Sequence, residues 1–141
     1  MGRILAFDYG KKRIGLAVTD PGQIIASPLI TVPTSEIESF LLDYLKKEVV
    51  DEFVIGFPVQ MNNKPSNSVK YIDLFIKRLG RLFPDKPDNL MDERFASKLA
   101  MQTIIDGGVK KKDRRDKSLA DKISASLILQ SFLEKRKFSK R

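Results

Sequence analysis

The chain has 141 residues, of which 42% are hydrophobic, and its 26 Lys and Arg against 18 Asp and Glu give a formal net charge of +8. This length favours one domain over residues 1–141, and no apolar run approaches the roughly 20 residues that a membrane span needs. Cysteine and histidine are both absent, which excludes Cys/His zinc sites, cysteine nucleophiles and serine mechanisms with a histidine base. An enzyme of this composition must use carboxylates, lysines, hydroxyls or a bound metal.

The first 58 residues read as strands followed by one helix and a further strand. Apolar runs on either side of the turn Gly10-Lys11-Lys12-Arg13 predict two paired strands, and a third strand or strand pair follows over 23–32, interrupted at Pro28. Residues 35–38 have the form of a capping box before an amphipathic helix that ends near residue 49. A short apolar strand is predicted over 53–58. Because the N-terminus leads directly into the first strand, without a signal-like segment, we expect a cytoplasmic protein.

The second half alternates helices and strands. An amide-rich loop over 59–68 precedes a helix over 69–83, which Pro84 stops. A strand over 89–94, a helix from 97 to 107, a basic loop and a final helix over 118–136 complete the chain. This order predicts an α/β layer fold with a mixed sheet, antiparallel at its start and parallel where helices cross over.

The positive charge is concentrated at the C-terminal end. Residues 1–108 contain 14 basic and 14 acidic side chains, whereas residues 109–141 contain 12 basic and 4 acidic ones. Dense basic runs of this kind favour a polyanionic partner, nucleic acid before membrane, because no amphipathic apolar face accompanies them. The alternative is that they are only solvated segments.

Three acidic positions are expected at ends of strands or helices. Asp8 closes the first strand, Asp92 and Glu93 close the strand at 89–94, and Asp121 lies on the apolar stripe of the last helix. Each has a simpler alternative: Asp8 accepting hydrogen bonds from the following turn, the pair at 92–93 in a surface turn, and Asp121 capping its helix. In an α/β sheet, however, ligands gather at the carboxyl ends of parallel strands.

Carboxylates that converge at one place repel one another unless a cation neutralises them. Mg²⁺ or Mn²⁺ with oxygen ligands is the natural choice, and a pair of such ions can clamp the attacking water and the leaving oxygen of a phosphodiester. Residue reasoning alone therefore indicates a metal-dependent phosphodiesterase, and it leaves open whether Asp92 or Glu93 is the ligand. Strand alternation allows only one of the two to face the metal.

Four blocks occur in the order FDYGKKRIGLAVTD, VIGFPVQMNNKPS, DERFASKLA and ADKISASLILQSFLE. Together they resemble the YqgF/RuvX family of Holliday-junction-resolvase-like proteins over essentially the whole chain. The resemblance implies a ribonuclease-H-like fold, with a mixed five-stranded sheet and helices on both faces. It also implies a nuclease assigned to 5′-end maturation of pre-16S ribosomal RNA.

By position, the resemblance makes Asp8, Glu93 and Asp121 the catalytic metal ligands for Mg²⁺ or Mn²⁺. It also implies a set of basic residues that hold phosphates, namely Lys11, Arg13, Arg94, Lys110, Lys111, Lys112, Arg114, Arg115 and Lys117. The chain departs from the family pattern after the third block, with Ala96, Ser97 and Leu99 where hydroxyl residues and a glutamate are common. We expect this to affect helix capping or substrate contact and to leave the acids intact.

Two classes of function remain open at this point. The preferred one is a nuclease that acts on structured RNA, with branched four-way DNA as the alternative substrate of the same chemistry. The rival is a factor that binds ribosomal RNA or the transcription machinery with little catalysis. Three clustered carboxylates favour the enzyme, because a pure binder of polyanions gains nothing from them. The sequence does not decide between a monomer and a homodimer.

Overall fold

The computed structural model describes residues 2–10, 12–57, 68–92 and 117–139. Its five strands form one sheet in the order β3-β2-β1-β4-β5. The strands are β1 (Arg3–Asp8), β2 (Arg13–Thr19), β3 (Ala26–Pro33), β4 (Val50–Phe57) and β5 (Asp88–Asp92). The helices are η1 (Thr34–Glu36), α1 (Ile37–Lys47), α2 (Ser68–Leu82) and α5 (Lys117–Ser139). No helix in these described ranges is long and apolar enough to cross a membrane.

The predicted mixed sheet is confirmed. β1 pairs with β2 and β2 with β3 in antiparallel fashion, whereas β1–β4 and β4–β5 are parallel. The three parallel strands therefore end at the same edge of the sheet, at Asp8, Phe57 and Asp92. This is the edge at which the sequence predicted the acidic site.

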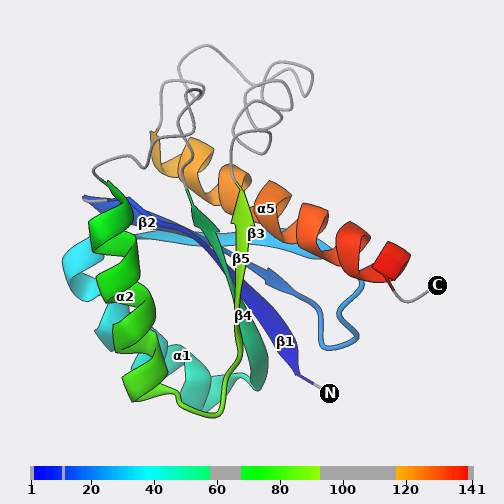
Figure 1. Ribbon diagram of the computed structural model, residues 1–141, viewed down its shortest axis with the longest axis horizontal. Helices are drawn as coiled ribbons and strands as arrows, with labels where there is room; N and C mark the ends of the chain where they lie inside the picture. The colour runs from blue at the N-terminus through cyan, green and yellow to red at the C-terminus, as the bar shows by residue number, and fades with distance from the viewer. Residues whose placement is uncertain (1, 11, 58–67, 93–116, 140–141) are drawn as a thin grey trace.

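Helices cover both faces of the sheet, as Figure 1 shows with α1 and α2 on one side and α5 on the other. Strand alternation divides the apolar residues between these two layers. Leu5 and Phe7 of β1 are fully buried against the α1 and α2 side, whereas Ile4 and Ala6 are fully buried against α5. β1 thus lies in the covered centre of the sheet, which explains its almost continuous run of apolar residues.

The expectation of a third strand broken at Pro28 is wrong, because β3 runs continuously through it. The register shifts between Leu16 and Ala17, whose partners are Ile30 and Pro28, so that Leu29 is the extra residue of a bulge. β3 is an edge strand, and an edge strand tolerates a proline because its outer side needs no ladder hydrogen bond.

The predicted capping box at 35–38 is also wrong. Residues 34–36 form the single turn η1, and neither η1 nor α1 receives a side-chain hydrogen bond at its N-cap. Ser35 lies inside the 3-10 turn, where it cannot occupy the N-cap position of α1. A proline at position 33 and the tight turn that follows start the helix instead.

The other elements agree with the sequence to within a few residues. β4 begins three residues earlier than expected, and α5 extends beyond residue 136 to Ser139. The helix predicted from 97 to 107, the basic loop after it and the loop over 59–67 lie outside the described residues.

Candidate active site at the carboxyl ends of the central strands

Asp8 is the last residue of β1 and lies at the carboxyl edge of the sheet. The alternation that turns Ile4 and Ala6 towards α5 places the half-buried Asp8 on the same face. Its partners in the neighbouring strands are Gly15 of β2 and Gly56 of β4. Neither glycine carries a side chain beside the carboxylate of Asp8, so the row of paired residues holds one acid between two glycines.

Gly15 also brings the third predicted acid to this position. A Cβ atom on Gly15 would lie under 3.0 Å from the carbonyl oxygen of Asp121, closer than real Cβ atoms come, so α5 crosses β2 in backbone contact at this point. Since Gly15 pairs directly with Asp8, the backbone of Asp121 lies beside the strand partner of Asp8. The fold therefore brings together two of the three acids that the sequence selected, although they are far apart in the chain.

Arg13 forms an ion pair with Asp121. Its Nε donates to Oδ2 of Asp121 at 2.5 Å, and both side chains are partly exposed, at 35% for Arg13 and 26% for Asp121. The resemblance implied that Arg13 contacts phosphate, and in this structure its guanidinium is engaged with a carboxylate of the site. The pair partly neutralises Asp121 and fixes the direction of its side chain.

The helix that carries Asp121 is packed along the stripe that the sequence predicted. Ala125, Ile128 and Phe132 follow at spacings of four, seven and eleven, and all three are buried against the sheet. Asp121 continues this stripe at its N-terminal end, where the helix reaches the edge of the sheet.

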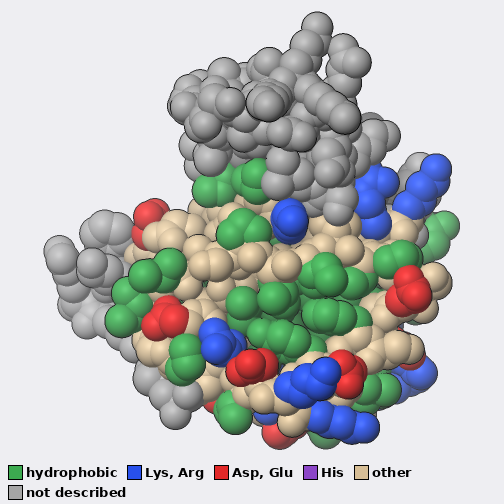
Figure 2. Space-filling model, turned by 180° about the vertical axis from the view of Figure 1, so that it is seen from behind, with side chains coloured by type: hydrophobic (Ala, Val, Ile, Leu, Met, Phe, Trp, Pro, Cys, Tyr) green, Lys and Arg blue, Asp and Glu red, His purple; other side chains and the backbone are tan. Residues whose placement is uncertain are grey.

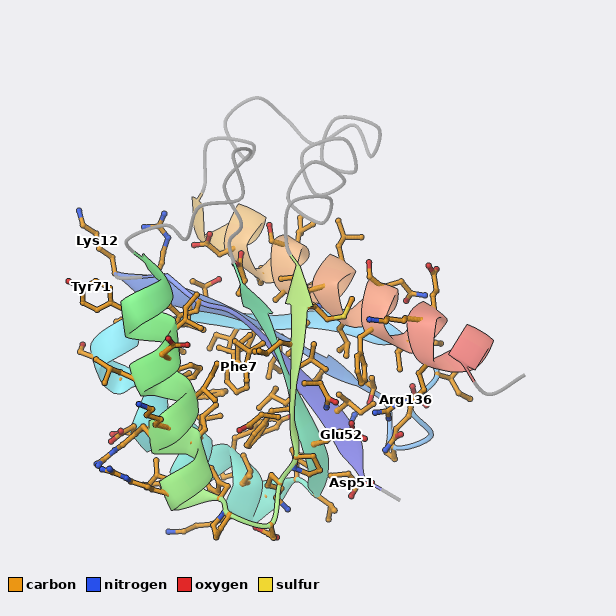
Figure 3. The ribbon with its side chains drawn as sticks, in the orientation of Figure 1. Phe7, Lys12, Asp51, Glu52, Tyr71 and Arg136 are labelled. Atoms are coloured by element: carbon orange, nitrogen blue, oxygen red, sulfur yellow. The ribbon has the colours of Figure 1, made fainter. Side chains whose placement is uncertain are left out.

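A polar cluster fixes the other end of α5. Arg136 makes two hydrogen bonds to Glu52 of β4, at 2.8 and 2.5 Å, and Asn89 of β5 donates to the same carboxylate. Figure 3 shows Glu52 and Arg136 directed towards each other. Glu52 lies near the start of β4, at the opposite edge of the sheet from the carboxyl ends of the parallel strands. The hydrogen bond from Arg136 holds the pKa of Glu52 below its usual value despite partial burial.

The remaining predicted site residues have different positions. Lys12, which is not one of the predicted residues, is exposed in the turn between β1 and β2, and Figure 3 shows it projecting outward at that end of the molecule. Lys117 is the first residue of α5. The others lie outside the described residues, namely Lys11, Glu93, Arg94, Lys110, Lys111, Lys112, Arg114 and Arg115.

The chemistry of the donors present fits a hard divalent cation. Asp8 and Asp121 supply carboxylate oxygens, which Mg²⁺ and Mn²⁺ prefer as ligands. Within the described ranges, no group of three or more acidic side chains is close enough to hold a metal. Glu93, the third predicted ligand, follows directly after β5 and is not among those residues.

Figure 2 shows the face of the molecule opposite to that in Figure 1, on which Lys and Arg side chains are interspersed with Asp and Glu. This mixture agrees with the equal numbers of basic and acidic residues before position 109.

Gly15 is not among the site residues that the sequence predicted, although its position in the strand carries a signal. A glycine in the middle of an apolar strand indicates a bulge or a close approach of another backbone. Here it marks the contact with α5, on which the meeting of the two acids depends.

The mixed five-stranded sheet with helices on both faces defines the class of fold, the ribonuclease-H-like α/β fold. Thermus thermophilus RuvC, solved with a Holliday junction substrate, aligns with a TM-score of 0.57 over 96% of both chains at 15% identity. The fowlpox virus Holliday junction resolvase aligns with a TM-score of 0.54, at 15% identity, over 95% of this chain and 99% of its own. At these identities the likeness shows the fold, and it confirms the expected fold class.

Sequence comparison places the chain more narrowly. The family model described as "RuvX: Holliday junction resolvase" matches residues 2–135, and the protein belongs to this family. A relative from Phocaeicola vulgatus, named "Putative pre-16S rRNA nuclease", is 53% identical over 98% of this chain and 99% of its own length. A relative of the same name from Parabacteroides distasonis is 50% identical over the same shares. The resemblance found in the four sequence blocks is confirmed.

Proposed function

We propose that this protein is a divalent-metal-dependent nuclease that hydrolyses phosphodiester bonds at the site between β1 and the start of α5. The observation that carries the proposal is the backbone contact between Gly15 and Asp121, because it places Asp121 next to the strand partner of Asp8. Two carboxylates from separate elements at the carboxyl edge of a sheet form a cation site that a binding protein for polyanions would not need.

Glu93 is the third ligand of the proposed site. β5 turns Met91 towards the α5 side, where it packs against the core under that helix. The match to the third sequence block assigns Glu93, and not Asp92, to the site, which is the choice that the residues alone left open.

A cation bound by these carboxylates would lower the pKa of an attacking water and would neutralise charge on the phosphate. Asp8 would hold the cation from the rigid central strand, and Asp121 would hold it from α5. Arg13 forms an ion pair with the carboxylate of Asp121. Its guanidinium would also attract a phosphate bound at the site. The basic residues before α5 and in the turn at 10–13 would position the rest of the nucleic acid without reading its sequence.

The proposed substrate is the precursor of 16S ribosomal RNA. The support is that relatives about half identical over nearly their full length carry the name of a pre-16S rRNA nuclease. The family description instead names Holliday junctions, so four-way DNA is the second candidate. Both the relatives' name and the family description refer to proteins that act on nucleic acid. A role in ribosomal RNA processing would place this protein in the cytoplasm of a bacterium.

Cleavage assays on both substrates test the proposal. A 5′-extended 16S precursor RNA and a four-way DNA junction are incubated with wild type and Asp8→Asn in Mg²⁺, in Mn²⁺ or in EDTA. We expect cleavage that requires the metal and falls at least about 100-fold in Asp8→Asn, since a carboxylate ligand is replaced by a neutral amide. Binding of the substrate, measured in EDTA, should be retained.

The substrate that is cut faster identifies the physiological one of the two. Binding that is sensitive to salt, with no cleavage in either metal, would instead assign the protein to the class of binding factors. Cleavage that survives Asp8→Asn unchanged would place the chemistry elsewhere in the molecule.

A further inference from the structure

We propose that a groove along α2 binds an unpaired RNA strand that continues from the active site. The groove has a volume of about 490 Å³ and lies between α2, the start of α1 and the residue that follows β1. The aromatic and apolar residues that line it, which we call its floor, include Tyr9, Tyr71, Leu74 and Phe75. The cations Lys77 and Arg81, which we call its rim, line it as well, together with the acid Glu38. We call it the α2 groove. This inference rests on the proposed function, because it assigns the groove to the same substrate.

The α2 groove begins at the site end of the molecule. Tyr9 follows Asp8 directly and packs against Phe75, with ring centroids 5.1 Å apart, so it lies on the opposite face of the sheet from the carboxylate. Thr34, which also lines the groove, is tied to the turn between β1 and β2: its Oγ1 donates to the carbonyl of Gly10 and its backbone N–H donates to the carbonyl of Lys12. A strand leaving the acids at the sheet edge therefore reaches the groove across this turn.

The floor of the groove presents apolar and aromatic surface to solvent. Tyr71 is 46% exposed and Leu74 is 64% exposed, on a helix whose other apolar residues are mostly buried. Tyr9 is partly buried, and its ring packs against that of Phe75 in the same groove. Exposed aromatic rings next to cations are the usual platform for stacking unpaired bases, which any base can use.

The cations that line the groove lie in the second half of α2. Residues 71 and 81 are ten positions apart, so the groove extends for roughly 15 Å along the helix. Lys77 and Arg81 are exposed and form no ion pair within the described ranges, whereas Arg78 between them is paired with Glu38 of α1. Lys12 adds a further exposed cation at the site end. The cations on the rim complement a phosphate backbone, and the apolar floor complements bases.

A single strand suits this surface better than a duplex does. In a duplex the bases are stacked on one another and cannot reach an aromatic floor, whereas bases of an unpaired segment can be splayed onto side chains. The groove would therefore favour a substrate with a single-stranded extension beside the scissile phosphate. A second copy of the chain is the alternative occupant of an exposed apolar helix face.

Binding measurements in EDTA separate this inference from the nuclease activity. The full-length protein is titrated into a fluorescently labelled single-stranded RNA, the DNA of the same sequence and a blunt RNA duplex. The variant is Tyr71→Ala, and the matched control is Leu42→Ala on α1, because Leu42 is also 46% exposed and does not line the groove. We expect Tyr71→Ala to weaken binding of the single-stranded RNA about 5- to 50-fold, with duplex binding changed less than about 2-fold.

A second pair of variants tests the charges. Lys77→Gln combined with Arg81→Gln should weaken single-strand binding and lower its salt dependence, whereas Lys46→Gln on α1 should do neither. Equal losses on single strand and duplex, or no loss in either groove variant, would overturn the inference. So would sedimentation that shows a dimer in wild type and a monomer in Tyr71→Ala, because the groove would then belong to a second copy. If wild type cuts no substrate, the proposed function fails and the binding result still stands by itself.

Discussion

Gly15 and Arg13 are two residues of β2 on which the geometry of the site depends. Gly15 allows the backbone of α5 to contact β2, and Arg13 binds the carboxylate that this contact brings to the sheet edge. Both act through Asp121, the acid on the stripe of the last helix. A small change in either residue should therefore move a ligand of the proposed cation without touching Asp8.

Gly15→Ala is the direct test of the contact. A Cβ at this position would overlap the carbonyl oxygen of Asp121, which is backbone of a packed helix and cannot rotate away. We expect the free energy of unfolding to fall by about 1–3 kcal/mol, as is usual for overpacking, and cleavage to fall more than stability explains. Chemical denaturation and cleavage at a temperature well below the melting point measure the two effects.

Gly80→Ala is the control for this substitution. Gly80 lies inside α2, and apart from its chain neighbours and the adjacent backbone of its own helix, no atom lies within 4 Å of its would-be Cβ. The added methyl group should stabilise the protein by about 0.5–1 kcal/mol, because alanine loses less backbone entropy in a helix, and cleavage should not change. Equal behaviour of the two alanine variants would contradict the proposed role of the β2–α5 contact.

At the scale of the elements, α5 connects two parts of the molecule. Its N-terminal end carries Asp121 at the site, and its C-terminal end is held to β4 by the pair Glu52–Arg136. The Arg136 guanidinium also lies 4.4 Å from the centroid of Phe132, so the cation covers an aromatic ring of the helix stripe. The pair therefore fixes the position of the helix along the sheet.

This pair predicts a pH dependence of stability. The pKa of Glu52 is lowered in the folded protein from its ordinary value of 4.5. A lowered pKa means that the pair contributes fully above pH 4.5, and that the contribution is lost as the pH falls from there through the folded pKa. Glu52→Gln should cost about 1–2 kcal/mol at pH 7 and much less in acid, below the folded pKa of Glu52.

Unfolding curves of wild type and Glu52→Gln between pH 7 and pH 3 measure the difference. The contributions of other carboxyls to the pH dependence cancel in the difference between the two proteins. These carboxyls include Asp20, whose pKa is lowered by backbone hydrogen bonds, and Asp88, whose pKa is raised by burial. A gap between the two curves that is independent of pH would show that the charge of Glu52 does not contribute.

At the scale of the whole molecule, the net charge of the first 108 residues differs from that of the segment that leads into α5. The first 108 residues are balanced, and the excess of positive charge lies after them. If the basic run before α5 holds phosphates, the double substitution Lys111→Gln with Lys112→Gln should weaken the binding of all nucleic acids to the same extent. The slope of log affinity against log salt should decrease by roughly 0.7 to 0.9 for each phosphate that the variant no longer neutralises.

Lys46→Gln with Lys47→Gln on α1 is the matched control, since it removes the same charge from the balanced part of the chain. An equal change of slope in this control would mean that net charge matters and position does not. A preference of the Lys111 and Lys112 variant for one sequence over another would contradict a role restricted to phosphates.

The local pattern of residues determined the elements and the layers of this protein. Apolar alternation and helical spacing predicted the strands of the mixed sheet and the buried stripe of α5, because these depend on which side chains a local segment can bury. The four sequence blocks also predicted the family, and their acids pointed to the carboxyl edge of the sheet. The predictions of a break at Pro28 and of a capping box that begins at Ser35 were wrong, because an edge strand and a 3-10 turn depend on neighbours that are distant in the chain.

Only the tertiary structure decided which groups meet. Three features of the site arise from contacts between β1, β2, β4 and α5. Asp8 has glycines as strand partners on both sides, the backbone of Asp121 contacts Gly15, and Arg13 pairs with Asp121. The register of strands and the crossing point of a helix are set by packing of the whole core, and no segment encodes them by itself. The sequence by itself determined which residues could carry out the chemistry, and the packing of the sheet against α5 determined their arrangement.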